Sequence, residues 1–146
     1  MSRTVMYAVQ AALQLAQSDG SRPIPCSQIA NQGQMPERFL LQILRSLVTH
    51  GILHSTRGVD GGYGLDRSPA EISLLDIIEA VEGPLVSLPL EGGSEELQIR
   101  LNDAVCGVNA LVSRELGSIK LSHLLAPAVV NNSEPQLIAS ERVLTN

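Results

Sequence analysis

The chain has 146 residues, of which 44% are hydrophobic and 17% are charged, and its formal net charge is −5 at pH 7. This length and composition exclude a disordered chain and suit one globular domain with an appended element. The charge is uneven, because residues 1–69 carry six arginines against four acids (+2) and residues 70–146 carry four bases against eleven acids (−7). The acidic total argues against a nucleic-acid binder, whereas the basic first half keeps that function open.

Two helices are predicted in the first part of the chain. Small and apolar residues recur at helical spacing between Val5 and Ala16, and the run Asp19-Gly20-Ser21 ends this pattern. A short second helix begins near Pro25, because proline is favoured in a first turn, and it ends before Gly33.

A third helix is predicted over residues 36–50, with Pro36 in its first turn and Gly51 closing it. Its apolar positions form a stripe that should face the core, namely Phe39, Leu40, Ile43, Leu44, Leu47 and Val48. Its opposite face carries Arg38, Leu41, Gln42, Arg45 and Thr49. Two helices joined by a short turn make the helix-turn-helix arrangement, whose second helix enters the major groove of DNA.

A β-hairpin is predicted directly after the third helix. Residues 52–56 and 63–65 are its strands, and residues 57–62 form a glycine-rich turn between them. A hairpin in this position makes the winged form of the helix-turn-helix. A phosphate-binding loop is the weaker interpretation of these glycines, because no helix begins directly after them.

The second half of the chain is predicted to be helical. Ser73 and Asp76 form the pattern of a capping box for a fourth helix, which ends at Gly83-Pro84. A long helix follows from about Ser94 to Leu116, and a last short helix begins near Ile119.

The long helix carries one apolar stripe, and no other helix is left in the chain to cover it. We therefore expect a dimer interface formed by Leu97, Leu101, Val105, Val108, Leu111 and Val112. The predicted fold class is mainly α with a small β-hairpin. It comprises a winged helix-turn-helix domain (1–83), a loop (84–93), dimerisation helices (94–130) and a flexible tail (131–146).

The outer face of the third helix suits base recognition. Arginine can bind the O6 and N7 atoms of guanine, and glutamine can bind the N6 and N7 atoms of adenine. Leu41 could touch a thymine methyl group or pack against a neighbouring helix, and the sequence leaves both open. Arg57 could enter a narrow minor groove or be an ordinary surface residue of the hairpin.

Metal, membrane and secretion signals are missing from the sequence. Cys26 and Cys106 stand far apart, without the spacing of a zinc site, and no apolar run reaches the ~18 residues of a membrane helix. The first residues lack the order of a secretory signal peptide. We therefore expect a cytoplasmic protein with no metal and no membrane contact.

Several motifs together resemble the Rrf-two (Rrf2) family of bacterial winged-helix transcriptional regulators. They are Met6-Tyr7-Ala8-Val9, Ile29-Ala30, Phe39-Leu40, Gln42-Ile43-Leu44, Gly51-Ile52-Leu53, the hairpin sequence RGVDGGYGL, and Ile72-Ser73-Leu74 followed by Asp76-Ile77-Ile78. The resemblance is strong over residues 3–83 and weaker beyond. It implies a homodimer on a near-palindromic operator of double-stranded DNA, with two recognition helices in successive major grooves.

The resemblance also implies which residues contact DNA. Arg38, Leu41 and Gln42 fall where family members contact bases, although the acid usual at the position of Leu41 is missing. Arg57 falls on the arginine that enters the minor groove. With their neighbours, the predicted DNA-binding residues are Arg3, Thr4, Tyr7, Pro36, Glu37, Arg38, Leu41, Gln42, Arg45, Arg57, Gly58, Gly61 and Gly62.

The resemblance fails at the cysteines. Iron–sulfur members of the family carry three cysteines before the dimerisation helix, whereas residues 84–105 contain none, so we expect no bound cluster and no cofactor. Cys106 is interpreted as a small core residue on the hydrophobic side of the long helix. Cys26 lies in the first turn of the second helix, where the helix dipole favours thiolate, and is either a redox thiol or a passive one.

The favoured function is a dimeric, sequence-specific DNA-binding transcriptional regulator. The alternative is a dimeric interaction module that binds a metabolic enzyme as a protein partner through its acidic half. An enzyme is not expected, because no catalytic pair of carboxylates, Ser-His pair or Cys-His pair stands in a recognisable motif.

Overall fold

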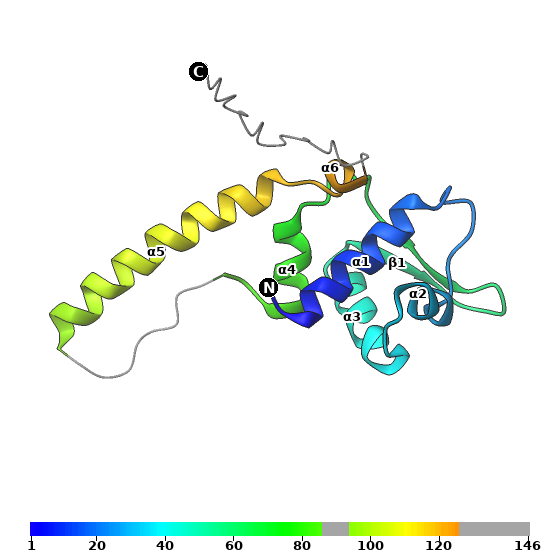
Figure 1. Cartoon of the computed structure of the whole chain (residues 1–146), viewed down its shortest axis with the longest axis horizontal. Coiled ribbons are helices and arrows are strands. Elements are labelled where there is room, and N and C mark those ends of the chain that lie inside the picture. Colours follow the sequence, from blue (N-terminus) through cyan, green and yellow to red (C-terminus); the bar gives the residue numbers. More distant parts are fainter. Residues whose placement is uncertain (86–93, 126–146) are drawn as a thin grey trace, which may run out of the picture.

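The computed structural model describes residues 1–85 and 94–125. In chain order its elements are α1 (Arg3–Gln17), α2 (Cys26–Gly33), α3 (Glu37–Thr49), β1 (Leu53–Thr56), β2 (Gly62–Leu65), α4 (Leu74–Glu82), α5 (Glu95–Ser118) and α6 (Leu121–Leu125). Helices α1 to α4 form one body, from which the hairpin and α5 project at opposite ends (Figure 1). This architecture confirms the predicted fold class of a mainly helical chain with a winged helix-turn-helix.

The first helix starts at a serine cap and packs through small residues. The Val5 amide donates to the Ser2 hydroxyl at 3.2 Å, which satisfies one of the free N–H groups of the first turn. Ala8, Ala11 and Ala12 are fully buried, so neighbouring helices approach the α1 backbone closely. Helix α1 therefore lies at the centre of the body, in contact with α2, α3, α4 and α6.

The turn between α2 and α3 depends on one left-handed residue. Gln34 has φ 51°, and its amide donates to the carbonyls of Ala30 and Asn31. The Met35 amide then donates to Ala30 O at 2.9 Å, which closes the end of α2, and its side chain is buried. The chain reverses here within a few residues, and α3 begins directly after Pro36.

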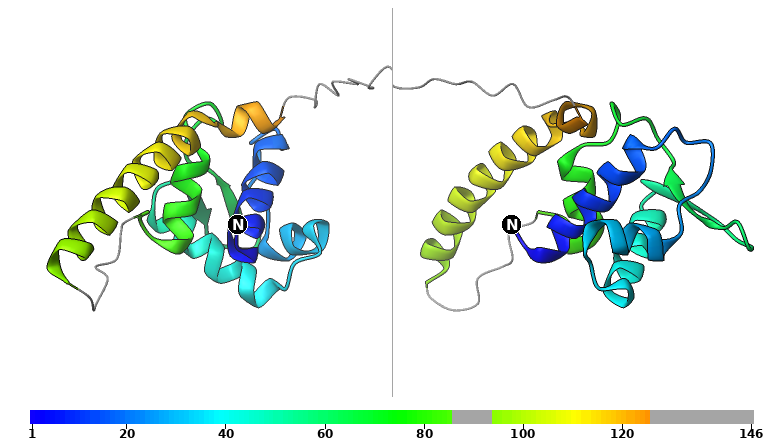
Figure 2. Two further views of the ribbon diagram at one scale, coloured as in Figure 1. Left: turned by 60° about the vertical axis from the view of Figure 1, so that its left-hand side comes forward. Right: turned by 45° about the vertical axis from the view of Figure 1, so that its right-hand side comes forward.

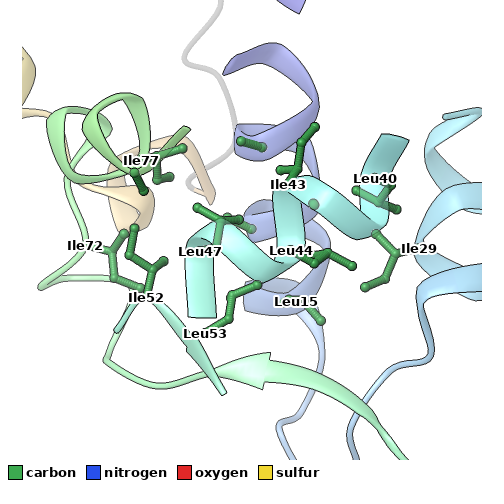
Figure 3. Packing of buried hydrophobic residues seen from close by; sticks show 14 of the residues in the cluster. Leu15, Ile29, Leu40, Ile43, Leu44, Leu47, Ile52, Leu53, Ile72 and Ile77 are labelled. Atoms are coloured by element: carbon green, nitrogen blue, oxygen red, sulfur yellow. The ribbon is translucent and has the colours of Figure 1, made fainter. Parts of the chain in front are cut away.

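The hydrophobic core is built around α3. The predicted stripe is confirmed, because Leu40, Ile43, Leu44 and Leu47 are buried and Phe39 and Val48 are partly buried against them. Figure 3 shows Leu40 and Ile29 at one end of the cluster and Ile72 and Ile77 at the other. Each fully buried leucine or isoleucine contributes about 1.5–3 kcal/mol, so this face of α3 is fixed to the body. Its opposite face is left toward solvent.

The hairpin is tied to the segment that precedes α2. Strands β1 and β2 are antiparallel, with Leu53 opposite Leu65 and Thr56 opposite Gly62. Ile24 forms a bridge with Tyr63, in which each amide donates to the other residue's carbonyl at 2.9 Å. The hairpin is therefore held at a fixed angle to the helix-turn-helix.

The capping box predicted for the fourth helix is confirmed. The Asp76 amide donates to the Ser73 hydroxyl at 3.1 Å, and the Ser73 amide donates to the Asp76 carboxylate at 2.9 Å. Gly83, with φ +87°, follows the last residue of α4. This glycine accounts for the end of α4 at the predicted position.

Helix α5 runs for 24 residues and has no buried residue. It starts at the Ser94 cap and contacts the body mainly through α4 (Figure 2). After it the chain returns to the body, where Leu121 of α6 is fully buried in the core beside α1. Most of the predicted loop (residues 86–93) and the predicted tail (131–146) lie outside the described residues. Within the described ranges, no helix is long and apolar enough to cross a membrane.

Candidate nucleic-acid interface

The outer face of α3 presents polar side chains to solvent. Arg38, Gln42, Arg45 and Thr49 are exposed and recur every three or four residues, which places them on one side of the helix. Leu41 is partly exposed beside them. The Thr49 hydroxyl donates to the Arg45 carbonyl at 3.0 Å, and neither Arg38 nor Arg45 forms an ion pair among the described residues. The face can therefore donate hydrogen bonds to groups outside the chain.

The start of α1 lies against the start of α3. The rings of Tyr7 and Phe39 meet edge to face, with centroids 5.9 Å apart and planes at 72°. Thr4, Gln42 and Ser46 line a hollow of about 250 Å³ beside this pair. Two residue groups that are far apart in sequence, the α1 start and the α3 face, thus form one continuous surface.

The first turn of α3 exposes Pro36 and Glu37. The negative charge of Glu37 is favourable at this end of the helix, because the peptide dipoles point their positive ends there. Glu37 also lies close to the start of α2, since its backbone carbonyl is 3.9 Å from the Cys26 sulfur. The first turns of α2 and α3 therefore lie side by side at this edge of the recognition face.

The tip of the hairpin is fully open. Arg57, Gly58, Val59 and Asp60 are all exposed, and Gly58 has φ +114°, a conformation that other residues avoid. Val59 is 104% exposed, an apolar side chain standing free at the tip. Val59 is not among the predicted DNA-binding residues, although a branched apolar residue inside a glycine-rich turn is a signal for such an exposed tip.

The two glycines that follow are packed against the protein's own backbone. A Cβ atom on Gly62 would lie 2.8 Å from Pro25 N and closer still to the carbonyl of Ile24. A Cβ atom on Gly61 would meet the carbonyls of Thr56 and Gly58. These glycines allow the hairpin to turn and to join the Ile24 segment.

The arginines on these surfaces are free to bind anions. Arg3, Arg38, Arg45 and Arg57 are exposed, and none of them forms an ion pair within residues 1–85 and 94–125. Arg67 differs, because it faces Asp76 and the end of α3. The +2 balance of the first half is therefore concentrated on side chains that can reach a phosphate backbone.

Of the two interpretations left open for Cys26, the structure favours the passive thiol over the redox thiol. Burial raises the pKa of the Cys26 thiol, and the nearby Glu37 carboxylate raises it further. Both effects come from the tertiary fold rather than from the position of Cys26 in α2. Cys26 is accordingly held as a thiol, partly buried against the core.

The interpretation of Cys106 as a core residue is wrong. Cys106 is exposed, and no residue of α5 is buried. At 3.6 residues per turn, Cys106 and Ile99 fall on the side of α5 opposite the stripe of Leu101, Val108 and Val112. The helical spacing therefore separates Cys106 from the apolar stripe.

The apolar stripe of α5 is open along its length. Its large side chains are 39–60% exposed, and they are Leu97, Leu101, Val105, Val108, Leu111 and Val112. Ile99 is also exposed, but on the other side of the helix. A row of this kind on a single chain is typical of a surface that another molecule covers.

An exposed helix that follows a tight turn, flanked by an open hairpin, defines a winged helix-turn-helix protein. The family model of Rrf2, described as an iron-dependent transcriptional regulator, matches residues 1–127. The chain belongs to the Rrf2 family.

Relatives and solved structures agree with this assignment. The chain is 38% identical over 88 residues to an HTH-type transcriptional regulator of Mycobacterium tuberculosis, a match that covers 60% of this chain but only 55% of the relative. It is 34% identical over 103 residues to the HTH-type transcriptional regulator CymR of Bacillus subtilis, covering 68% of this chain and 75% of the relative. The expectation of a regulator rather than an enzyme is confirmed by these relatives.

Two solved structures are similar over most of the chain. The structure of CymR, the global cysteine regulator of B. subtilis, has a TM-score of 0.63 and 32% identity, covering 86% of this chain and 95% of the other. The structure of T. potens IscR has a TM-score of 0.65 and 31% identity, covering 86% and 85%. The similarity therefore includes parts beyond the helix-turn-helix.

The iron dependence in the family description does not fit the residues of this chain. An iron–sulfur cluster is held by cysteine thiolates, and the whole sequence has two cysteines, on α2 and α5. Among the described residues, no three His, Cys, Asp or Glu side chains are grouped as metal ligands.

Proposed function

We propose that this chain is a homodimeric, sequence-specific DNA-binding transcriptional regulator. The observation that carries the proposal is the outer face of α3, where Arg38, Gln42 and Arg45 stand exposed while the opposite face is fixed in the core. A helix with these donors on one side, raised from the body by a tight turn, matches the shape of a major groove.

Base recognition falls to three side chains of α3. Arg38 can bind guanine through two hydrogen bonds, and Gln42 can bind adenine in the same way, each giving about 1–3 kcal/mol of discrimination. Leu41 lies beside them with part of its surface exposed, and offers an apolar contact to a thymine methyl group. Arg45 stands one turn further along and suits a phosphate.

The hairpin tip is assigned to the minor groove. Arg57 supplies the positive charge that a narrow groove attracts, and Gly58 keeps the backbone beside it free of a side chain. Val59 adds an apolar contact to the sugar edges of the same groove. Gly61 and Gly62 act indirectly, because they let the hairpin join the Ile24 segment.

The start of α1 is assigned to the phosphate backbone. Arg3 is exposed at the first turn, and Thr4 lies in the hollow that Gln42 also lines. Tyr7 is held against Phe39 and so presents its hydroxyl from a fixed ring. Pro36 and Glu37 line the edge between these contacts and the bases.

A second copy of the chain is assigned to the stripe of α5. Six large apolar side chains exposed on one side of a 24-residue helix are complementary to an identical stripe. Two copies related by a two-fold axis would place their α3 helices in successive major grooves about 34–36 Å apart. The operator would then be a near-palindrome.

The test is a titration of fluorescent DNA from upstream of the gene, followed by anisotropy at several salt concentrations. Specific binding should weaken steeply as salt rises, since each phosphate contact releases counterions. Arg57→Ala should lose about 1–3 kcal/mol of operator affinity, with dimerisation unchanged. Arg114→Ala, which replaces an exposed arginine of α5 that pairs with its neighbour Glu115, is the matched control and should bind like the parent. If the parent binds no upstream fragment even at low salt, the proposal fails.

A further inference from the structure

Arg67 lies between the end of the recognition helix and the start of α4. Its Nε atom donates to the Gly51 carbonyl at 3.2 Å, and Gly51 is the residue that closes α3. Its Nη2 atom is 3.8 Å from the Asp76 carboxylate in the first turn of α4. The side chain is 38% exposed, so it is partly shielded by the elements that it joins.

Asp76 contacts both Arg67 and the N-terminal cap of α4. The same carboxylate oxygen that faces Arg67 accepts the Ser73 amide at 2.9 Å. Ser73 is 3% exposed and its hydroxyl accepts the Asp76 amide, so the cap is buried and fixed in both directions. Asp76 therefore connects Arg67 to Ser73.

Ser73 lies where the chain that follows the C-terminal end of α5 contacts the start of α4. It forms a β-bridge with Lys120, and on either side of it the Leu74 amide donates to Ile119 O and the Leu121 amide donates to Ile72 O, both at 2.9 Å. These contacts join the end of α5 to the start of α4. Helix α4 lies between α5 and the rest of the body (Figure 2). A continuous polar path thus runs from Gly51 through Arg67, Asp76 and Ser73 to the α5–α6 junction.

We propose that Arg67 is a positioning residue that fixes the orientation of α3 relative to α5, and thereby sets the spacing of DNA half-sites that a dimer accepts. The inference rests on the proposed function, because it needs a dimer joined through α5. A guanidinium is suited to this role, since its planar donors hold two acceptors in one rigid geometry.

The consequence for DNA follows from the helical repeat. Inserting one base pair between half-sites moves them apart by about 3.4 Å and turns one against the other by roughly 35°. A dimer whose α3 helices are fixed to its α5 helices cannot follow this change and loses contacts. A dimer in which this connection is loosened can follow it, so it discriminates less between spacings.

The experiment measures the affinity of the full chain for three operators and one half-site. The operators carry the natural spacing, one base pair fewer and one base pair more, and the variants are Arg67→Gln and Asp76→Asn. Asp76→Asn keeps an acceptor for the Ser73 amide and so preserves the cap, while it removes the charge that faces Arg67. Arg57→Ala is the control, because it removes a DNA contact and should weaken binding equally at every spacing. Urea unfolding midpoints show that each variant is folded.

We expect the parent to lose about tenfold or more in affinity when the spacing changes by one base pair, and the Arg67 and Asp76 variants to lose less than about threefold. Their affinity for the single half-site should equal that of the parent. If both folded variants keep the spacing preference of the parent, Arg67 serves stability alone and the inference is overturned. If the parent binds no DNA, or binds without a preferred spacing, the proposed function itself fails and the inference falls with it.

Discussion

Replacing Gly62 by alanine would force a methyl group into the backbone that precedes α2. The new Cβ would lie 2.8 Å from Pro25 N and closer still to the carbonyl of Ile24, so the hairpin or the Ile24 segment must shift. Neither is the free end of a flexible side chain. The two hydrogen bonds between Ile24 and Tyr63, each 2.9 Å long, are the first contacts that such a shift would strain.

The expected loss follows from these contacts. Overpacking against fixed atoms costs about 1–3 kcal/mol, and each strained hydrogen bond costs about 0.5–1.5 kcal/mol. A movement of the hairpin relieves the overpacking at the expense of the hydrogen bonds, so the two terms do not add in full. We expect a decrease of about 2–4 kcal/mol in the free energy of unfolding, which corresponds to a urea midpoint lower by about 1–2 M.

Urea unfolding of Gly62→Ala measures this loss, and Gly64→Ala is the matched control. A Cβ on Gly64, two residues along the same strand, would lie nearest to the ring of His54, a half-exposed side chain that can rotate aside at the cost of its 3.8 Å contact with Asp66. The control should therefore lose less than about 1 kcal/mol. Operator affinity should fall in Gly62→Ala and not in Gly64→Ala, since only the former moves Arg57. Equal midpoints for the two variants would refute the packing role assigned to Gly62.

The remaining predictions concern the stripe, the thiol and the core. Val108→Glu should convert the dimer to monomer in sedimentation velocity, with a dimer Kd at least about a hundredfold higher. Ile99→Glu, on the opposite side of α5, should stay dimeric. A dimeric Val108→Glu variant would exclude the stripe as the interface. In a Cys106→Ser background, Cys26 should react with iodoacetamide more slowly than free cysteine at pH 7.5, because the pKa of this thiol is raised. The reaction rate should increase at higher pH. A rate that is already at its plateau at neutral pH would contradict the raised pKa. Leu44→Ala, at a fully buried position, should cost about 2–5 kcal/mol in the free energy of unfolding, against less than about 0.5 kcal/mol for Leu124→Ala at an exposed position; equal losses would contradict the assigned core.

Local signals in the sequence predicted the elements because the residues that specify each element are neighbours in the chain. The Ser73–Asp76 capping box spans four positions, and the stripe from Leu40 to Leu47 repeats with the period of a helix. Gly51 and Gly83 ended helices where expected, each with a positive φ. The order and nearly all bounds of the helices and strands could therefore be predicted without any knowledge of long-range contacts.

The contacts that join elements could not be predicted in this way. The bridge between Ile24 and Tyr63 and the path through Arg67 link segments whose spacing in the sequence carries no periodic signal. Burial and the Glu37 carboxylate raise the pKa of Cys26, and both are supplied by the tertiary fold, so the position of Cys26 in α2 could not predict this direction. The candidate DNA surface could be predicted as a set of residues, but not the way in which Tyr7 and Phe39 bring its two halves together.

The full burial of Leu121 has a consequence for the order in which the protein is made. This side chain completes the core beside α1, yet it is translated after the whole of α5. A nascent chain from which only α1 to α4 and the hairpin have emerged still lacks the side chain of Leu121 in its core. The amide hydrogens of its first helices should therefore exchange with water faster than those of the complete protein. The winged helix-turn-helix therefore reaches its final stability only after α5 has also been synthesised, so the candidate DNA-binding surface and the candidate dimer interface become available at the same stage of synthesis.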